Sequence, residues 1–192
     1  MKINLACGLT KLNGYVNVDA NPEVKPDEVV NVGADFLPWK DQSCEEVVFF
    51  HAIEHIEKKY HATIFTEIHR ILTPGGRLLL GYPEFGVCCK FWLENHLGKR
   101  DFWEACIYGR QCDPKDFHVS AMHTPEVMDL LRNIGFEDVA FKYEEDNPQY
   151  AILKAVKSNE KPLTYEETVN ELIFRGSTLR VSVADSNNMV GS

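Results

Sequence analysis

Short apolar runs alternate with helical periodicities along most of this chain. The first four predicted strands are runs rich in β-branched and aromatic residues, at 2–7, 15–19, 29–32 and 46–50. Apolar residues then recur at helical spacing from Tyr60 to Leu72, and a tight turn at 73–76 separates this helix from a fifth strand at 77–82. The first two strands follow each other without a full helix between them.

A second helix with a buried apolar stripe is predicted to start at Thr124, before Pro125, and to stop at Gly135. Two further strands are predicted at 136–143 and 149–157. Strands that alternate with helices favour a Rossmann-like α/β fold: a doubly wound, mostly parallel sheet with helices on both faces. Ligands of such sheets bind beyond the carboxyl ends of the strands.

Two segments do not follow this alternation. Residues 84–123 form an insertion after the fifth strand, with two predicted helices rich in aromatic residues, the second opened by Asp101 with Glu104 three positions later. We expect this insertion to be a substrate lid. Residues 158–192 hold a further capping box, helix and strand, which we expect to pack as an extension on the domain formed by 1–157.

Composition narrows the class of protein. The chain has 192 residues, which suits one domain, and its net charge of -9 disfavours nucleic acid as a partner. The sequence has no apolar stretch of membrane-spanning length and no signal-peptide pattern, so we expect a cytoplasmic protein with a small-molecule substrate and no membrane contact. Its six scattered cysteines are expected to be reduced. The oligomeric state cannot be read from the sequence.

Five segments at the predicted strand ends and turns carry a family resemblance. They are Asn-Leu-Ala-Cys-Gly at 4–8, Asn-Val-Asp at 17–19, Ala-Asp-Phe-Leu-Pro at 34–38, His-Ala-Ile-Glu-His at 51–55 and Leu-Thr-Pro-Gly-Gly at 72–76. In this order they resemble the class I S-adenosylmethionine-dependent methyltransferases, and among these the small type 11 group. The resemblance covers about residues 2–157. It implies S-adenosylmethionine as cofactor and S-adenosylhomocysteine as product.

The resemblance also implies a cofactor site. Gly8 would let the backbone approach the ligand, Asp19 would accept from the ribose hydroxyls, and Asp35 would accept from the adenine amino group. Both aspartates could instead be helix caps or solvated loop acids. Ala6 stands where a fuller motif has its first glycine. The implied cofactor-binding residues are Ala6, Cys7, Gly8, Asp19, Ala20, Asp35, Phe36, Leu37, His51, Glu54 and His55.

Histidines are the candidates for acid–base chemistry. We predict methyl transfer to an oxygen or nitrogen acceptor, with His118 or His123 as the general base because they lie between the lid and the next helix. Glu54 and His55 are further candidates. The spacing of His51 and His55 is compatible with zinc, but the sequence offers no clear third ligand, so no metal is predicted.

Two other functions stay open. The chain could be a module that binds S-adenosylmethionine without catalysis, because a fold and a cofactor site do not guarantee chemistry. More distantly, Tyr150-x-x-x-Lys154 matches the spacing of a nicotinamide-dependent oxidoreductase. That pair falls in a predicted strand, where positions four apart do not meet as they do on a helix, and no phosphate-binding glycine loop follows the first strand.

Overall fold

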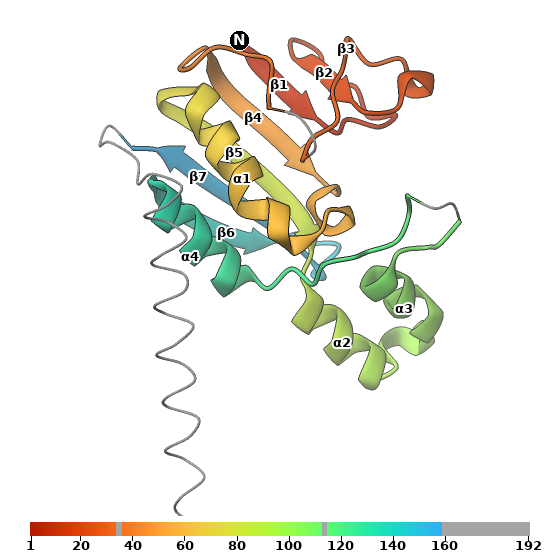
Figure 1. The fold of residues 1–192 in the computed structure, drawn as a ribbon. Coiled ribbons are helices and arrows are strands. Elements are labelled where there is room, and N and C mark those ends of the chain that lie inside the picture. The colour runs from red at the N-terminus through yellow and green to blue at the C-terminus, as the bar shows by residue number, and fades with distance from the viewer. Residues whose placement is uncertain (34–35, 113–114, 159–192) are drawn as a thin grey trace, which may run out of the picture.

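A seven-stranded sheet forms the centre of the protein in a computed structural model that describes residues 1–33, 36–112 and 115–158 (Figure 1). The strand order is β3-β2-β1-β4-β5-β7-β6. The strands are β1 (Lys2–Leu5), β2 (Val16–Asp19), β3 (Glu28–Val29), β4 (Cys44–Phe50), β5 (Leu72–Pro83), β6 (Phe136–Tyr143) and β7 (Tyr150–Lys157). The first five are parallel, and β7 runs antiparallel between β5 and β6. The predicted mostly parallel Rossmann-like sheet is confirmed.

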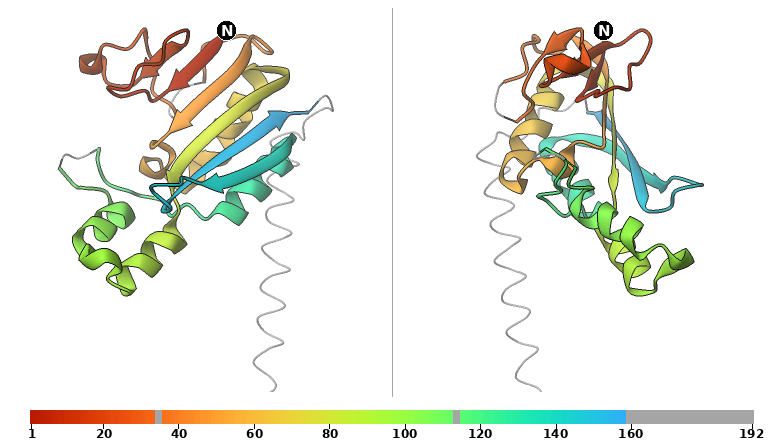
Figure 2. Two further views of the ribbon diagram at one scale, coloured as in Figure 1. Left: turned by 180° about the vertical axis from the view of Figure 1, so that it is seen from behind. Right: turned by 90° about the vertical axis from the view of Figure 1, so that its right-hand side faces the viewer.

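Helices cover one face of this sheet. The two long helices, α1 (His61–Ile71) and α4 (Thr124–Ile134), contact each other and lie on the same side (Figures 1 and 2). Their apolar stripes meet the inward side chains of the central strands. This core includes Ile3, Val47, Phe49, Phe65, Ile68, Leu78, Leu80, Leu131 and Leu153.

The prediction of helices on both faces is wrong for the described part of the chain, where no helix lies over the opposite face (Figure 2). The polar side chains on that face explain why the sheet can meet water on this side. Glu46 of β4 lies between Lys2 and Arg77 of the neighbouring strands, and it bonds to Arg77 and to the hydroxyl of Tyr15. Charged partners cover this carboxylate so well that it is 3% exposed without a helix above it.

Several predicted boundaries shift by a few residues. The predicted turn at 73–76 is an irregularity within β5, because that strand pairs with Cys44 at Leu72 and regains regular pairing at Arg77. The start of α4 at Thr124 is as predicted, with His123 at the position before it. The Asp101 cap is also wrong: the helix starts at Arg100, and no side chain caps it.

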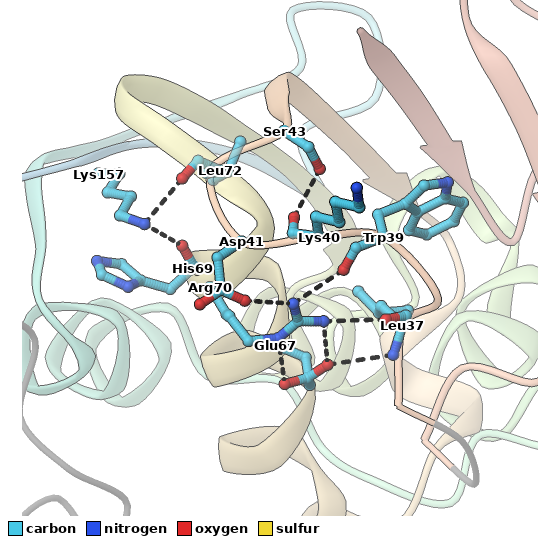
Figure 3. A network of polar contacts seen from close by, with 10 residues as sticks. All are labelled: Leu37, Trp39, Lys40, Asp41, Ser43, Glu67, His69, Arg70, Leu72 and Lys157. Carbon is cyan, nitrogen blue, oxygen red and sulfur yellow. Dashed lines mark hydrogen bonds and ion pairs between the residues drawn. The ribbon is translucent and has the colours of Figure 1, made fainter.

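The partly buried guanidinium of Arg70 fixes the loop that precedes β4 (Figure 3). Arg70 of α1 donates to the carbonyl oxygens of Leu37 and Trp39 and pairs with Glu67 and Asp41. This loop directly follows residues 34–35. Arg70 therefore anchors the segment that carries part of the predicted cofactor site to a helix of the core.

The insertion between β5 and α4 holds two helices, α2 (Phe85–Leu93) and α3 (Arg100–Tyr108), at the edge of the sheet where β5 ends (Figure 1). They share a small core of Cys88, Trp103, Cys106 and Ile107. All six cysteines are unpaired, and four of them are buried. Across the described ranges, no helix has the length and apolarity to cross a membrane. The helix and strand predicted in the last segment of the chain lie outside the described residues.

Candidate active site

The loop after β1 adopts a backbone that few side chains tolerate. Ala6 and Gly8 have φ values of 49° and 50°, so the alanine at the first glycine position occupies the left-handed region that favours glycine. Asp19 holds this loop: Oδ2 accepts from the Gly8 N–H and Oδ1 from the Asn21 N–H, both at 2.8 Å. Each oxygen keeps a second lone pair, so the carboxylate can still accept from a ligand hydroxyl.

The space above Gly8 fits a ligand that lies close to the backbone. A Cβ added there would meet no heavy atom within 4 Å among the described residues. No neighbouring side chain of the described residues therefore occupies the space beside Gly8. Strained backbone at the carboxyl end of a parallel strand is typical of ligand sites.

The loop after β3 is described from Phe36 onwards, and Asp35 lies outside the described residues. Phe36 is 81% exposed, whereas Leu37 is buried and its N–H donates to Glu67. A cavity of about 230 Å³ lies between these residues and α1, lined also by Val32 and Tyr60. An aromatic side chain at the mouth of such a cavity can stack on a flat ring.

The loop after β4 begins with another strained residue. His51 has a φ of 52°, its N–H donates to the carbonyl oxygen of Gly81, and its ring packs against Tyr150 at 4.7 Å between centroids. The chain then makes a single 3-10 turn at Ile53–His55. This turn carries Glu54 and His55 to the edge of the sheet.

Hydrogen bonds between loops bring His118 to this turn. The N–H groups of Val119 and Ser120 donate to the carbonyl oxygen of Glu54, at 2.9 and 3.2 Å. The Nδ1 of His55 in turn bonds to the carbonyl oxygen of Phe117 at 3.0 Å. The rings of His55 and His118 then lie 4.8 Å apart, edge to face.

The two imidazoles share one tautomer. The Nδ1 of His118 bonds to the carbonyl oxygen of Cys106 at 3.1 Å. A carbonyl oxygen can only accept, so Nδ1 is the protonated nitrogen in both His55 and His118. In the neutral form of each ring, Nε2 carries the lone pair.

Glu54 completes the cluster from a buried position. Its side chain is 2% exposed, and Oε2 has no hydrogen-bond partner among the described residues. Burial raises the pKa of this carboxyl to about 8. Burial, with the nearby His55, lowers the pKa of His118. One donor atom each from Glu54, His55 and His118 lies within 4.8 Å of the others.

A cavity of about 430 Å³ opens beside this cluster. Its walls come from the loop after β4, from α3, from the loop that follows α3 and from the start of β7. They include His51, Glu54, His55, Phe102, His118 and Tyr150. The insertion therefore lies against the strand ends, with a hollow between them of the size that small-molecule sites have.

His123 is not part of this cluster. Its Nδ1 bonds to Glu84 at 2.9 Å, and Glu84 also caps α2 by accepting from the Val87 N–H. The two histidines that the sequence analysis treated together thus have different surroundings. Tyr150 was not predicted as a cavity residue, because the sequence indicated only that it lies in a strand. Its place at the start of that strand was the one signal that could have put it near the cavity.

Comparison with known proteins supports a methyltransferase. Residues 9–80 match the family model of the methyltransferase domain. A search of curated protein sequences gives no significant match. Among solved structures, a SAM-dependent methyltransferase from Archaeoglobus fulgidus is similar with a TM-score of 0.60 and 12% identity, over 81% of this chain and 85% of that one.

Two further structures have the same fold. A SAM-dependent methyltransferase from Methanosarcina mazei gives a TM-score of 0.57 at 18% identity, over 83% of this chain and 92% of its own. One from Thermotoga maritima gives 0.58 at 16% identity, over 82% of both chains. These structures show that the chain has the fold of S-adenosylmethionine-dependent methyltransferases, and residues 9–80, less than half of the chain, match the methyltransferase domain.

Proposed function

We propose that this enzyme methylates a hydroxyl or amine of a small molecule, which binds in the cavity beside Glu54, His55 and His118. The observation that carries the proposal is that one carboxylate oxygen of Glu54 and one ring nitrogen each of His55 and His118 lie within 4.8 Å of one another. Such groups act on a protic nucleophile, because a hydroxyl or ammonium must lose its proton as it gains a methyl group.

The cofactor would lie across the carboxyl ends of β1, β2 and β4. Gly8 leaves room for it, Asp19 has spare lone pairs for the ribose hydroxyls, and His51 borders both the strand ends and the acceptor cavity. When bound, S-adenosylmethionine supplies a methyl group on a positively charged sulfur that is a good leaving group. The residues of the chain then have to orient the acceptor and activate its nucleophilic atom.

The cavity favours a small acceptor. A volume of about 430 Å³, with α3 on one side, suits a metabolite-sized molecule. The net charge of -9 points the same way, because a phosphate backbone would be repelled. Phe102 and Tyr150 give the walls an apolar part, and the cluster supplies the polar part that fixes orientation.

The test is methyl transfer from labelled S-adenosylmethionine to a panel of small hydroxyl and amine compounds, with a single-stranded oligonucleotide alongside. We expect product with a small molecule and none with the oligonucleotide. His118→Ala should lower kcat by about 100-fold or more, the usual contribution of a positioned acid–base group. His123→Ala is the matched control and should stay within about threefold of wild type, because its ring faces Glu84.

Two results would contradict the proposal. Equal losses in His118→Ala and His123→Ala would show that the cavity cluster has no special part in turnover. Tight binding of S-adenosylmethionine with no transfer to any acceptor class would favour the module without catalysis.

A further inference from the structure

We propose that Glu54, His55 and His118 bind a divalent transition-metal cation, such as Mn²⁺, Co²⁺ or Zn²⁺, which holds the acceptor in the cavity. The role of the cation rests on the proposed function, but its binding does not. The sequence alone predicts no metal, because it offers no clear third ligand beside the histidines at 51 and 55. The N–H groups of Val119 and Ser120 donate to the carbonyl oxygen of Glu54. These hydrogen bonds bring His118, more than 60 positions away in the sequence, beside Glu54 and His55.

The donor set is one that such cations prefer. Two imidazole nitrogens with one carboxylate oxygen bind first-row divalent metals, whereas Ca²⁺ and Mg²⁺ prefer sites made of oxygen alone. Three protein ligands also leave coordination positions for a substrate, as in catalytic zinc sites. Here the remaining positions would face the cavity of about 430 Å³.

The surroundings of both histidines match those of metal ligands. Metal-binding histidines usually donate their other N–H to a carbonyl or carboxylate, which fixes the tautomer and directs the lone pair at the metal. His55 does so to Phe117 and His118 to Cys106. The two carbonyl groups belong to different segments, so the fold supplies this orientation twice, independently.

The buried carboxylate gives a second, separate indication. Buried polar atoms nearly always have a partner, yet Oε2 of Glu54 has none within the described residues. A purely structural carboxyl would be expected to pair with a neighbouring donor. Both neighbouring imidazoles instead have their N–H groups turned toward carbonyl oxygens, and a cation would satisfy the carboxylate and both lone pairs together.

A bound cation would explain how the acceptor is activated. A hydroxyl oxygen that binds a divalent cation loses its proton more readily, as metal-bound water does. The proton passes to solvent, the acceptor oxygen attacks the methyl carbon, and the bond from that carbon to sulfur breaks with its electron pair staying on sulfur. His51 and Asp116 also line the cavity and could contact the acceptor's other polar groups.

The experiment is calorimetric titration of the full-length protein with Mn²⁺ after treatment with a chelator, repeated with Co²⁺ while its visible absorption is recorded. We expect one ion per chain, with at least tenfold weaker binding in Glu54→Gln, His55→Ala and His118→Ala. His96→Ala and His123→Ala are matched controls that should bind as wild type does. Circular dichroism checks that each variant is folded, and the nearly isosteric Glu54→Gln serves if the alanine variants are not.

The outcomes separate this inference from the proposed function. No binding, or equal binding by wild type and the three ligand variants, overturns the metal site, and a loss of turnover in His118→Ala would then still support the proposed function. Binding that depends on the three ligands supports the site, even if no small acceptor is methylated. In active enzyme, chelation should abolish turnover and added Mn²⁺ should restore it.

Discussion

His69 makes a sharp prediction about how stability depends on pH. The side chain lies in the last turn of α1, 2% exposed, where Nε2 is 3.3 Å from the carbonyl oxygen of Gly135 and the ring packs on Phe136. Burial lowers the pKa of His69 from 6.5 to about 4, and the charge of Lys157 acts in the same direction. Protonation is therefore easier in the unfolded chain than in the folded one.

The sign and the magnitude follow from that difference. Because the pKa of His69 is lower in the folded protein, its protonation favours unfolding as pH falls below 6.5. The resulting loss in the free energy of unfolding levels off below about pH 4. The full difference corresponds to about 3 kcal/mol, of which about 2 kcal/mol is already lost at pH 5. A protein of ordinary stability, about 5–15 kcal/mol, would lose a substantial part of it.

His69→Gln isolates this contribution, because glutamine keeps a donor for the carbonyl oxygen of Gly135 and does not titrate. The assay is urea denaturation of both proteins at pH 7 and pH 5. Wild type should lose about 2 kcal/mol more than the variant over this interval, while other groups titrate alike in the two proteins. An equal loss in both, within about 0.5 kcal/mol, would refute the assignment of this pKa.

Two further predictions concern the segments that frame the site. Arg70→Ala should lower the free energy of unfolding, measured by urea denaturation, by about 2–3 kcal/mol, because it removes charge-assisted bonds from a largely buried Glu67. Arg70→Lys should recover only part of the lost stability. Gly109→Ala should lower the melting temperature and turnover, since its Cβ would lie 1.8 Å from the carbonyl oxygen of Asp116 at a φ of 81°. Gly14→Ala is the matched control, with a φ of 80° but no atom of the described residues within 4 Å of the added Cβ, so only the backbone strain of about 1 kcal/mol remains.

Local patterns in the sequence were enough for most elements of the fold. The apolar spacing of α1 and α4 and the β-branched runs of the central strands predict these elements because hydrophobic periodicity is set by neighbours in sequence. The same reasoning predicted a strand at 149–157, which argued against the oxidoreductase alternative and is confirmed by β7 at Tyr150–Lys157. The five ordered segments led to the prediction of a methyltransferase, and residues 9–80, which hold four of them, match the methyltransferase domain.

The remaining features of the fold and the site depend on contacts between segments that are distant in the sequence. The sequence could not tell that one sheet face lacks helices within the described ranges, because the cover of Glu46 comes from side chains on three different segments. Nor could it separate His118 from His123, which lie five positions apart and have similar surroundings in sequence. Backbone hydrogen bonds between two loops turn His118 toward Glu54, and the cap of α2 holds His123 away. A site assembled from such pairings depends on tertiary geometry, which no local periodicity encodes.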